Sequence, residues 1–271
     1  MPELPEVETT RRDIEPHLLG RTVTAVRIRN RKLRWPVSSA IRRILPGQRI
    51  TGVRRRAKYL LLETAAGTVI LHLGMSGSLR VLPADTPAEK HDHLDIVLDS
   101  GRALRLRDPR RFGTLLWTTS DPGRHKLLRT LGPEPLGDDF DGDYLFAKAR
   151  KRKVAIKNFI MNSHIVVGVG NIYASESLFL ARIHPQRAAG RITRVRYAAL
   201  AKAIRKVLTA AIQAGGTTLR DFSRADGEPG YFRQHLRVYG RAGKPCERCG
   251  TAIATRLTGQ RSTYYCPHCQ H

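Results

Sequence analysis

The sequence predicts an α+β fold in three parts, and three observations support it. Short apolar or alternating runs, separated by Gly, Pro or charged residues, dominate the N-terminal half, which is typical of a β-sandwich or barrel. Towards the C-terminus the apolar residues recur at helical spacing. All four cysteines come after residue 245, where they predict a small metal-bound module.

The N-terminal part is expected to begin with one helix and to continue as short strands. From Leu4 to Leu19, the residues Val7, Ile14 and Leu18 share one helical stripe, and Gly20 is a typical helix stop. Beyond this glycine the apolar period becomes that of strands. The expected strands are Val23–Ile28, Tyr59–Leu62, Thr68–Leu73, Ser78–Leu82, Leu94–Leu98, Ala103–Leu106 and Thr114–Trp117.

A linker and a helical region are expected next. The segment 132–142, GPEPLGDDFDG, is rich in Pro, Gly and Asp, which is typical of a linker. Further on, Thr193 is a candidate N-cap for a long helix that Gly215 and Gly216 would end. The polar, glycine-rich segment Thr217–Tyr231 is expected to be a loop.

The charge balance favours a polyanionic partner. The 271 residues include 48 Lys and Arg against 23 Asp and Glu, a net charge of +25. Basic side chains that meet phosphates release condensed counterions, so nucleic acid is the favoured partner. A solvated basic surface, a ribosomal protein and a membrane-surface protein remain alternatives. Because the sequence shows neither a membrane-length apolar run nor a signal-peptide pattern, we expect a cytoplasmic or nucleoid-associated protein.

The cysteines have the spacing of a zinc site. Cys246 and Cys249 form one C-x2-C pair, Cys266 and Cys269 form another, and 16 residues separate the pairs. Four thiolates would close a tetrahedral coordination sphere, so we predict one structural Zn²⁺ per chain. Disulfides or plain buried thiols are the alternative. His268 is expected to face solvent. The residues between the pairs predict a hairpin that carries Arg256, Arg261, Tyr264 and Tyr265.

The N-terminus offers a possible nucleophile. Removal of the initiator Met would expose the secondary amine of Pro2. An α-amino group has a pKa of roughly 7.7–8.0, so part of it is neutral near physiological pH and could attack an electrophilic carbon. Glu3 and Glu6 lie close enough in sequence to act as acid or base. Alternatively, this proline merely starts a helix whose positive end the carboxylates favour.

The whole chain resembles the formamidopyrimidine-DNA glycosylases, bacterial enzymes that excise oxidised purines such as 8-oxoguanine. The resemblance rests on PELPEVETTRR at 2–12, KYLLL at 58–62, HLGMSGSLR at 72–80, DPRRFG at 108–113, LGPEPL at 131–136, VVGVGNIYASESLF at 166–179, GGTTLRDF at 215–222 and QRSTYYC at 260–266. It implies a catalytic β-sandwich at 2–131, a linker at 132–150, a helix–two-turn–helix domain at 151–235 and a zinc finger at 236–271.

The resemblance also implies the reaction. Pro2 would attack C1′ of the damaged nucleotide and Glu3 would act as the partner acid or base, with Glu6 in a supporting role. The resulting iminium would permit β- and δ-elimination at the abasic site, after the base has been flipped out of the stack. Lys58 and Arg261 would complete the catalytic set, and Asn171 would bind a phosphate at the turn GVGN, which is expected to open a helix.

Further DNA contacts follow from the same resemblance. Met75, Arg110 and Phe112 match residues that fill the gap left by a flipped base, and Arg110 would read the orphan cytosine. For Met75 and Phe112, core packing is the alternative, although Gly74, Gly77 and Gly113 favour loops. The remaining predicted DNA-binding residues are His72, His93, Arg111 and Lys153. The segment Thr217–Tyr231 corresponds to a lesion-facing loop.

Two other functions compete with this interpretation. The related endonuclease VIII branch shares the proline and the glutamate but prefers oxidised pyrimidines, and the Met75, Arg110 and Phe112 set favours the purine branch. A zinc-ribbon protein that binds DNA without catalysis is the second alternative. The expected partner is double-stranded DNA that contains oxidised purines, with no membrane association, and the expected oligomeric state is a monomer.

Overall fold

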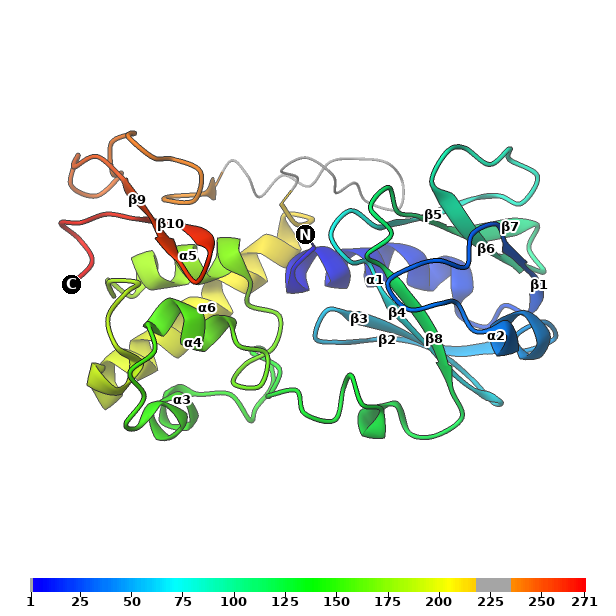
Figure 1. The fold of residues 1–271 in the computed structure, drawn as a ribbon, viewed down its shortest axis with the longest axis horizontal. Helices are drawn as coiled ribbons and strands as arrows, with labels where there is room; N and C mark the ends of the chain where they lie inside the picture. Colours follow the sequence, from blue (N-terminus) through cyan, green and yellow to red (C-terminus); the bar gives the residue numbers. More distant parts are fainter. Residues whose placement is uncertain (1, 218–234) are drawn as a thin grey trace. The chain divides into compact units, whose positions relative to one another are not determined.

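The computed structural model describes residues 2–217 and 235–271, which form two compact units (Figure 1). The first unit contains the chain up to Arg129 together with Ala214–Thr217. The second contains Thr130–Gln213 and residues 235–271. The predicted lesion-facing loop lies outside the described residues except for Thr217.

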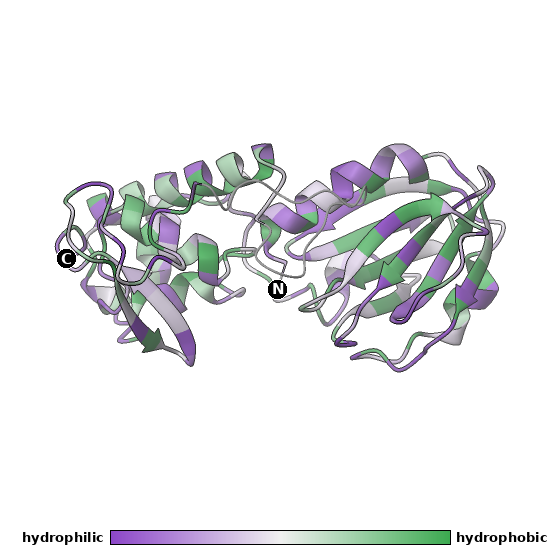
Figure 2. Ribbon diagram, turned by 90° about the horizontal axis from the view of Figure 1, so that it is seen from above, coloured by the Kyte–Doolittle hydropathy of each residue, from purple (hydrophilic) through white to green (hydrophobic). Residues whose placement is uncertain are grey.

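The first unit is a β-sandwich. One sheet has the order β1-β6-β7-β5 and the other has the order β2-β3-β4-β8, with all neighbouring strands antiparallel. Both sheets and the helices contribute to one hydrophobic core, and Figure 2 shows hydrophobic residues along these strands. The elements are α1 (Leu4–Leu18), β1 (Val23–Ile28), α2 (Ser39–Ile44), β2 (Ile50–Arg56), β3 (Tyr59–Thr64), β4 (Gly67–His72), β5 (Ser78–Pro83), β6 (Asp92–Leu98), β7 (Arg102–Arg107), β8 (Thr114–Thr118) and the short η1 (Pro122–Arg124).

The seven predicted strands and the first helix are confirmed, with ends displaced by at most two residues. Strand β2 and helix α2 were not predicted. In β2 only Ile50 and Val53 are buried, and the other positions carry three arginines, a glycine and a threonine, so the strand has a weak apolar signal. Helix α2 is short, with six residues, and is capped by the Ser38 side chain, which accepts a hydrogen bond from the Ala40 N–H at 3.2 Å.

A buried ion pair joins two strands of the first sheet. Asp95 in β6 and Arg105 in β7 are register partners and are both buried. Arg105 donates to the two carboxylate oxygens of Asp95 at 2.8 and 3.0 Å, and Arg29 donates to Asp95 as well. Burial would raise the pKa of Asp95, but the two arginines outweigh it and hold that pKa below its usual range.

The second unit contains helices and a two-stranded hairpin. Its elements are α3 (Gly142–Ala149), α4 (Ile156–Met161), α5 (Asn171–Leu180), the short η2 (Ala189–Arg191), α6 (Arg194–Gln213), β9 (Ala254–Thr258) and β10 (Arg261–Tyr265). Helix α3 lies within the range expected to be a linker and packs on α6. A Cβ at Gly142 would lie 2.4 Å from Ala198 Cα, so this close helix contact requires glycine.

Two local predictions for the second unit are confirmed. The Thr193 side chain accepts a hydrogen bond from the Arg196 N–H at 3.4 Å, which caps α6, and Gly215 and Gly216 follow the helix with φ of +73° and +83°. The hairpin turns at Gly259 and Gln260, whose φ angles of 57° and 61° suit the two-residue turn that matches strand twist.

Within residues 2–217 and 235–271, no helix has the length and apolar character needed to cross a membrane.

The buried ion pair gives a stability prediction. Arg105→Met should lower the free energy of unfolding by about 3–5 kcal/mol, because Asp95 would keep its charge in the sheet without its bidentate partner. Urea denaturation followed by circular dichroism measures this loss. Arg194→Met is the matched control, because the Arg194–Asp143 pair is exposed on both sides and its loss should change the free energy of unfolding far less. Equal losses in the two variants would contradict the prediction.

Candidate functional site

The start of α1 is held by the Glu6 carboxylate. The Glu3 N–H donates to Glu6 Oε2 at 2.8 Å, within a capping box, and the Thr217 N–H donates to Glu6 Oε1 at 2.8 Å. Both glutamates are buried, and so is Pro2. The predicted nucleophile therefore directly precedes Glu3, whose backbone N–H is held by Glu6, and Thr217 holds the other oxygen of the same carboxylate.

Lys58 lies in the turn between β2 and β3, and this turn is tied to α1. Ala57 has a left-handed φ of 55°, and its carbonyl oxygen accepts a hydrogen bond from Arg55 at 2.9 Å. The same arginine donates to Glu8 of α1 at 3.0 Å. Burial would raise the pKa of Glu8, but Arg11, Arg12 and Arg55 together lower it, so Glu8 stays ionised and holds the turn.

His72 is a neutral side chain at the end of β4. Its ring lies 4.8 Å from the ring of Tyr59, measured between centroids, and its Nδ1 accepts the Gly74 N–H at 2.9 Å. Burial, followed by repulsion from Lys58 and Arg34, lowers the pKa of His72 to about 4. Because Nδ1 is an acceptor, the proton of the neutral ring is on Nε2, which can donate to an anion.

The predicted gap-filling residues belong to two loops that touch. Met75 lies in the turn after β4 and Phe112 lies between β7 and β8. A Cβ at Gly74 would lie 2.4 Å from the backbone carbon of Phe112, so the loops meet at a position that only glycine permits. The core-packing alternative is wrong for Phe112, which is 42% exposed. Met75 is half-buried.

Asp108 fixes the second of these loops. Its carboxylate is fully buried and accepts hydrogen bonds from Ser76 Oγ at 2.8 Å, the Arg110 N–H at 3.3 Å and the Gly113 N–H at 2.7 Å. Its carbonyl oxygen lies 2.7 Å from His93 Nε2. Direct DNA binding by that nitrogen of His93 would therefore require the loss of this hydrogen bond.

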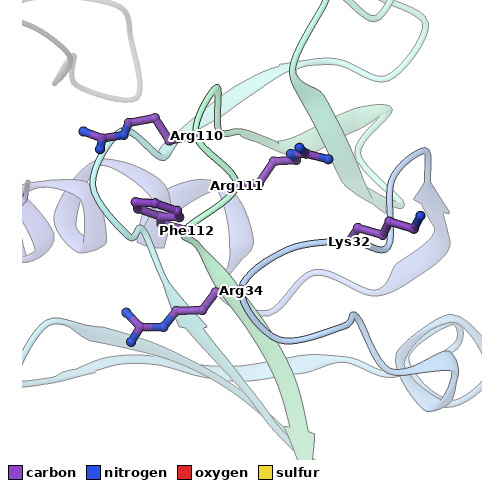
Figure 3. A pocket seen from close by; sticks show the side chains of 5 residues that line it. All are labelled: Lys32, Arg34, Arg110, Arg111 and Phe112. Atoms are coloured by element: carbon purple, nitrogen blue, oxygen red, sulfur yellow. The ribbon is translucent and has the colours of Figure 1, made fainter.

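A basic cavity of about 610 Å³ lies beside this loop (Figure 3). Arg110, Arg111 and Phe112 line it from the loop between β7 and β8, and Lys32 and Arg34 line it from the segment between β1 and α2. The guanidinium of Arg110 lies 5.1 Å from the centre of the Phe112 ring, and the Arg34 N–H donates to the Gly113 carbonyl oxygen at 3.2 Å. The sequence interpretation missed Lys32 and Arg34, although the basic run RNRKLR was a visible signal.

In the second unit, Asn171 and Lys157 both donate to one carbonyl oxygen of the hairpin. Asn171 is the first residue of α5, as the GVGN turn predicted, and its Nδ2 donates to the Ser262 carbonyl oxygen at 3.1 Å. Lys157 Nζ donates to the same oxygen at 3.1 Å and to Thr263 Oγ1 at 2.7 Å. Lys157 is fully buried, so these hydrogen bonds position the strand that begins with the exposed Arg261.

A third buried carboxylate, that of Glu176, holds the segment in front of the zinc module. Glu176 of α5 accepts the backbone N–H groups of Arg237, Val238 and Tyr239 at 2.9–3.0 Å. Burial raises the pKa of Glu176, and these three donors oppose that rise. The Tyr239 hydroxyl lies 3.4 Å from Asn171 Nδ2, so this segment adjoins the predicted phosphate-binding residue.

Lys157, Glu176 and Tyr239 were not identified from the sequence. A single charged residue in the apolar stretch IYASESLF was a signal for Glu176, because buried charges are rare unless paired. The predicted Lys153 is exposed and lies between α3 and α4. The nearby lysine that bonds to the hairpin is Lys157, in helix α4.

The four cysteines fit a zinc ion. Their sulfur atoms lie within 4.8 Å of one another, with Cys246 Sγ 4.0 Å from Cys269 Sγ and Cys249 Sγ 3.5 Å from Cys266 Sγ. A tetrahedral site with Zn–S distances of about 2.3 Å has sulfur–sulfur edges of about 3.8 Å. His268 is exposed, as expected. A bound zinc would crosslink the two C-x2-C turns and leave no open coordination position.

Three family models match the chain. The formamidopyrimidine-DNA glycosylase N-terminal domain matches residues 1–115, the H2TH domain of the same enzymes matches 131–223, and a zinc finger found in FPG and IleRS matches 243–271. The formamidopyrimidine-DNA glycosylase of Thioalkalivibrio sulfidiphilus is 63% identical over 270 residues and that of Syntrophotalea carbinolica is 60% identical, each with 100% of both chains covered.

The chain belongs to the formamidopyrimidine-DNA glycosylase family. It is therefore an enzyme of the DNA glycosylase class, as the resemblance implied, and it has one structural zinc, as the spacing of the cysteines predicted.

Solved structures of this family support the fold. A complex between a mutant of the Lactococcus lactis enzyme and DNA containing Fapy-dG has a TM-score of 0.92 and 35% identity, with 100% of both chains covered. The enzyme from Thermus thermophilus has a TM-score of 0.89 and 38% identity, with 99% of this chain and 98% of that chain covered. The α+β fold with sheets, a helical region and a zinc finger is confirmed.

The zinc site gives the first prediction for this region. Cys249→Ser should reduce the zinc content well below one ion per chain and weaken DNA binding, because one thiolate ligand is lost and the hairpin that carries Arg261 is no longer fixed. Zinc is measured by plasma mass spectrometry and binding by fluorescence anisotropy. His268→Ala is the control and should retain one zinc. Normal zinc content in Cys249→Ser would contradict the assignment.

The lowered pKa of His72 gives the second prediction. Because a pKa of about 4 lies below the usual value near 6.5, the ring should stay neutral from pH 8 to pH 5 and gain a proton only near pH 4. Proton NMR of the His72 ring measures this titration, and His72→Gln identifies its resonance by loss. A midpoint near 6.5 would contradict the burial and the charge repulsion described above.

Proposed function

We propose that this enzyme excises oxidised purines, such as 8-oxoguanine and formamidopyrimidines, from duplex DNA and then cuts the strand at the abasic site. The observation that carries the proposal is the fixed start of α1, directly after Pro2. There the backbone N–H groups of Glu3 and Thr217 both donate to the Glu6 carboxylate. Full-length similarity to enzymes of this name supports it, as does a relative bound to DNA that contains Fapy-dG.

The chemistry begins at the amine of Pro2 once Met1 has been removed. The nitrogen attacks C1′ as the glycosidic bond breaks, and the base departs and takes up a proton. The C1′–O4′ bond then breaks to give the iminium, and O4′ receives a proton from an acid for which Glu3 is the candidate. The iminium then acidifies C2′–H, so β-elimination releases the 3′ phosphate and δ-elimination releases the 5′ phosphate. The burial of Pro2 and Glu3 supports this role, since a site shielded from water strengthens electrostatic interactions.

The two units supply different DNA contacts in this proposal. Lys58 and the neutral Nε2–H of His72 bind phosphates in the first unit, while Met75, Arg110 and Phe112 fill the gap left by the flipped base. Arg111 and His93 are the other DNA-binding candidates of this unit. Arg111 belongs to the loop that carries Arg110 and Phe112, and His93 contacts the carbonyl oxygen of Asp108 in that loop. In the second unit, Asn171 and Arg261 bind phosphates, and Lys153 extends the basic surface. The exposure of Phe112 supports an intercalating role, since an exposed apolar ring is available for insertion.

The cellular setting follows from the same chemistry. We expect a monomer that acts in the cytoplasm on nucleoid DNA. The net charge of +25 supports attraction to the phosphate backbone before lesion recognition. Relatives whose complexes contain an abasic site or Fapy-dG support lesion-containing duplex DNA as the partner.

Pro2→Gly tests the mechanism. We expect excision of 8-oxoguanine opposite cytosine to fall by at least ~100-fold in single-turnover assays, because the secondary amine is lost. Binding of an uncleavable abasic-site analogue should change by less than about threefold. Pro5→Ala is the matched control, because it removes a proline from α1 but keeps the N-terminal amine. It should retain most of the excision activity.

Three outcomes decide between the candidate functions. Full excision activity in Pro2→Gly would overturn the proline mechanism. Activity of the wild-type enzyme on thymine glycol but not on 8-oxoguanine would place the enzyme with the pyrimidine-specific branch. Tight DNA binding without cleavage of either substrate would leave the non-catalytic zinc-ribbon alternative.

A further inference from the structure

The helix that follows Pro2 is joined to the turn of Lys58 by a buried ion pair. Glu8 of α1 and Arg55 of β2 have side chains that are only 12% and 11% exposed, and Arg55 Nε donates to Glu8 Oε2 at 3.0 Å. Arg55 Nη1 donates to the carbonyl oxygen of Ala57 at 2.9 Å. One guanidinium therefore bridges α1 and the turn between β2 and β3.

The Glu8 end of this bridge is held by further arginines. Glu8 Oε1 accepts hydrogen bonds from Arg11 Nη2 at 3.1 Å and from Arg12 Nε at 2.9 Å, while Oε2 accepts the bond from Arg55. Arg11 also donates to the Val53 carbonyl oxygen at 3.4 Å, so α1 contacts β2 at a second point. The carboxylate is therefore a fixed anchor for Arg55.

The other end of the bridge acts on the peptide that leads into Lys58. Ala57 is buried and has a left-handed φ of 55°, a conformation that a residue with a Cβ keeps only when its surroundings hold it there. Because a peptide unit is planar, the Ala57 carbonyl oxygen and the Lys58 nitrogen belong to one rigid group. The hydrogen bond from Arg55 to that oxygen therefore limits where the Lys58 side chain begins.

We propose that Arg55 is a positioning residue for Lys58, and that the reaction requires its two hydrogen bonds rather than its charge alone. A guanidinium presents several donors in a rigid plane, so it bonds to Glu8 and Ala57 at once, whereas the ammonium of a lysine is a point charge. This role rests on the proposed function, in which Lys58 belongs to the catalytic set. Arg55 acts through the backbone of Lys58 and is not itself a catalytic residue.

A positioning role and a purely stabilising role have different consequences. A misplacement of about 1 Å in a reacting group can lower a rate about 100-fold. Loss of the bond to Ala57 should therefore slow the chemical step and leave DNA affinity almost unchanged. An ion pair that only stabilises the fold would change the folding equilibrium, and the rate of the folded protein would stay the same.

The test uses the full-length, zinc-loaded enzyme in saturating excess over an 8-oxoguanine·cytosine duplex, so that the single-turnover rate reports the chemistry. Arg55→Lys keeps the charge and should lower this rate at least about tenfold, while binding of an uncleavable abasic-site analogue changes less than about threefold. Glu8→Gln, which removes the charge of the anchor at constant size, should also lower the rate. Circular dichroism melting shows that each variant is folded at the assay temperature.

Arg12→Lys is the matched control. Arg12 donates to the same Glu8 carboxylate, but from a position on α1 that is 57% exposed. Its replacement should change the single-turnover rate by less than about threefold, because exposed ion pairs contribute little.

A double-mutant cycle with Lys58 separates positioning from a general structural effect. Arg55→Lys should cost much less in a Lys58→Ala background than in the wild type, because no lysine side chain is left to position. Equal losses in the two backgrounds, a wild-type rate in folded Arg55→Lys, or an equal loss in Arg12→Lys would overturn the role of Arg55 alone. A wild-type enzyme that does not excise 8-oxoguanine would overturn the proposed function as well.

Discussion

The position of the N-terminal residues depends on the Glu6 carboxylate. A buried carboxylate is costly unless its oxygens accept hydrogen bonds, and Glu6 meets this requirement with the backbone N–H groups of Glu3 and Thr217. These donors are more than two hundred positions apart in sequence, so one side chain joins the start of α1 to the segment after α6. Pro2 precedes Glu3 directly. The same hydrogen bonds that make Glu6 tolerable in the interior therefore limit where the terminal amine can lie.

Two other buried carboxylates act in the same way. Asp108 accepts N–H groups of the loop that carries Arg110 and Phe112, and Glu176 accepts three N–H groups of the segment that carries Tyr239. In each case the carboxylate fixes the backbone from inside and leaves the side chains of the loop or segment available outside. Contacts held in place before the ligand arrives cost less conformational entropy on binding. The zinc site and the buried Lys157 likewise fix the backbone of the hairpin and leave the Arg261 side chain exposed.

The sequence predicted features whose signal is local. Alternating apolar residues identified seven strands, the spacing of the cysteines identified the zinc site, and Thr193 identified the start of α6. Features that depend on tertiary partners were missed. Strand β2 has only two buried residues and is completed by its pairing with β3. The sequence does not distinguish Lys157 from an ordinary surface lysine, because its hydrogen-bond partners belong to a hairpin that is distant in sequence. The resemblance, rather than residue spacing, supplied the reaction and the role of Pro2, because a terminal proline alone is more simply a helix start.

In the proposed mechanism, the amine of Pro2 forms a covalent bond with C1′ of a damaged purine nucleotide. The most direct measurement is to incubate the enzyme with an 8-oxoguanine·cytosine duplex and borohydride, and then to map the trapped adduct by mass spectrometry. We expect a reduced adduct on the N-terminal peptide, at Pro2, without Met1. An adduct on a lysine, or no adduct while 8-oxoguanine is still released, would contradict it.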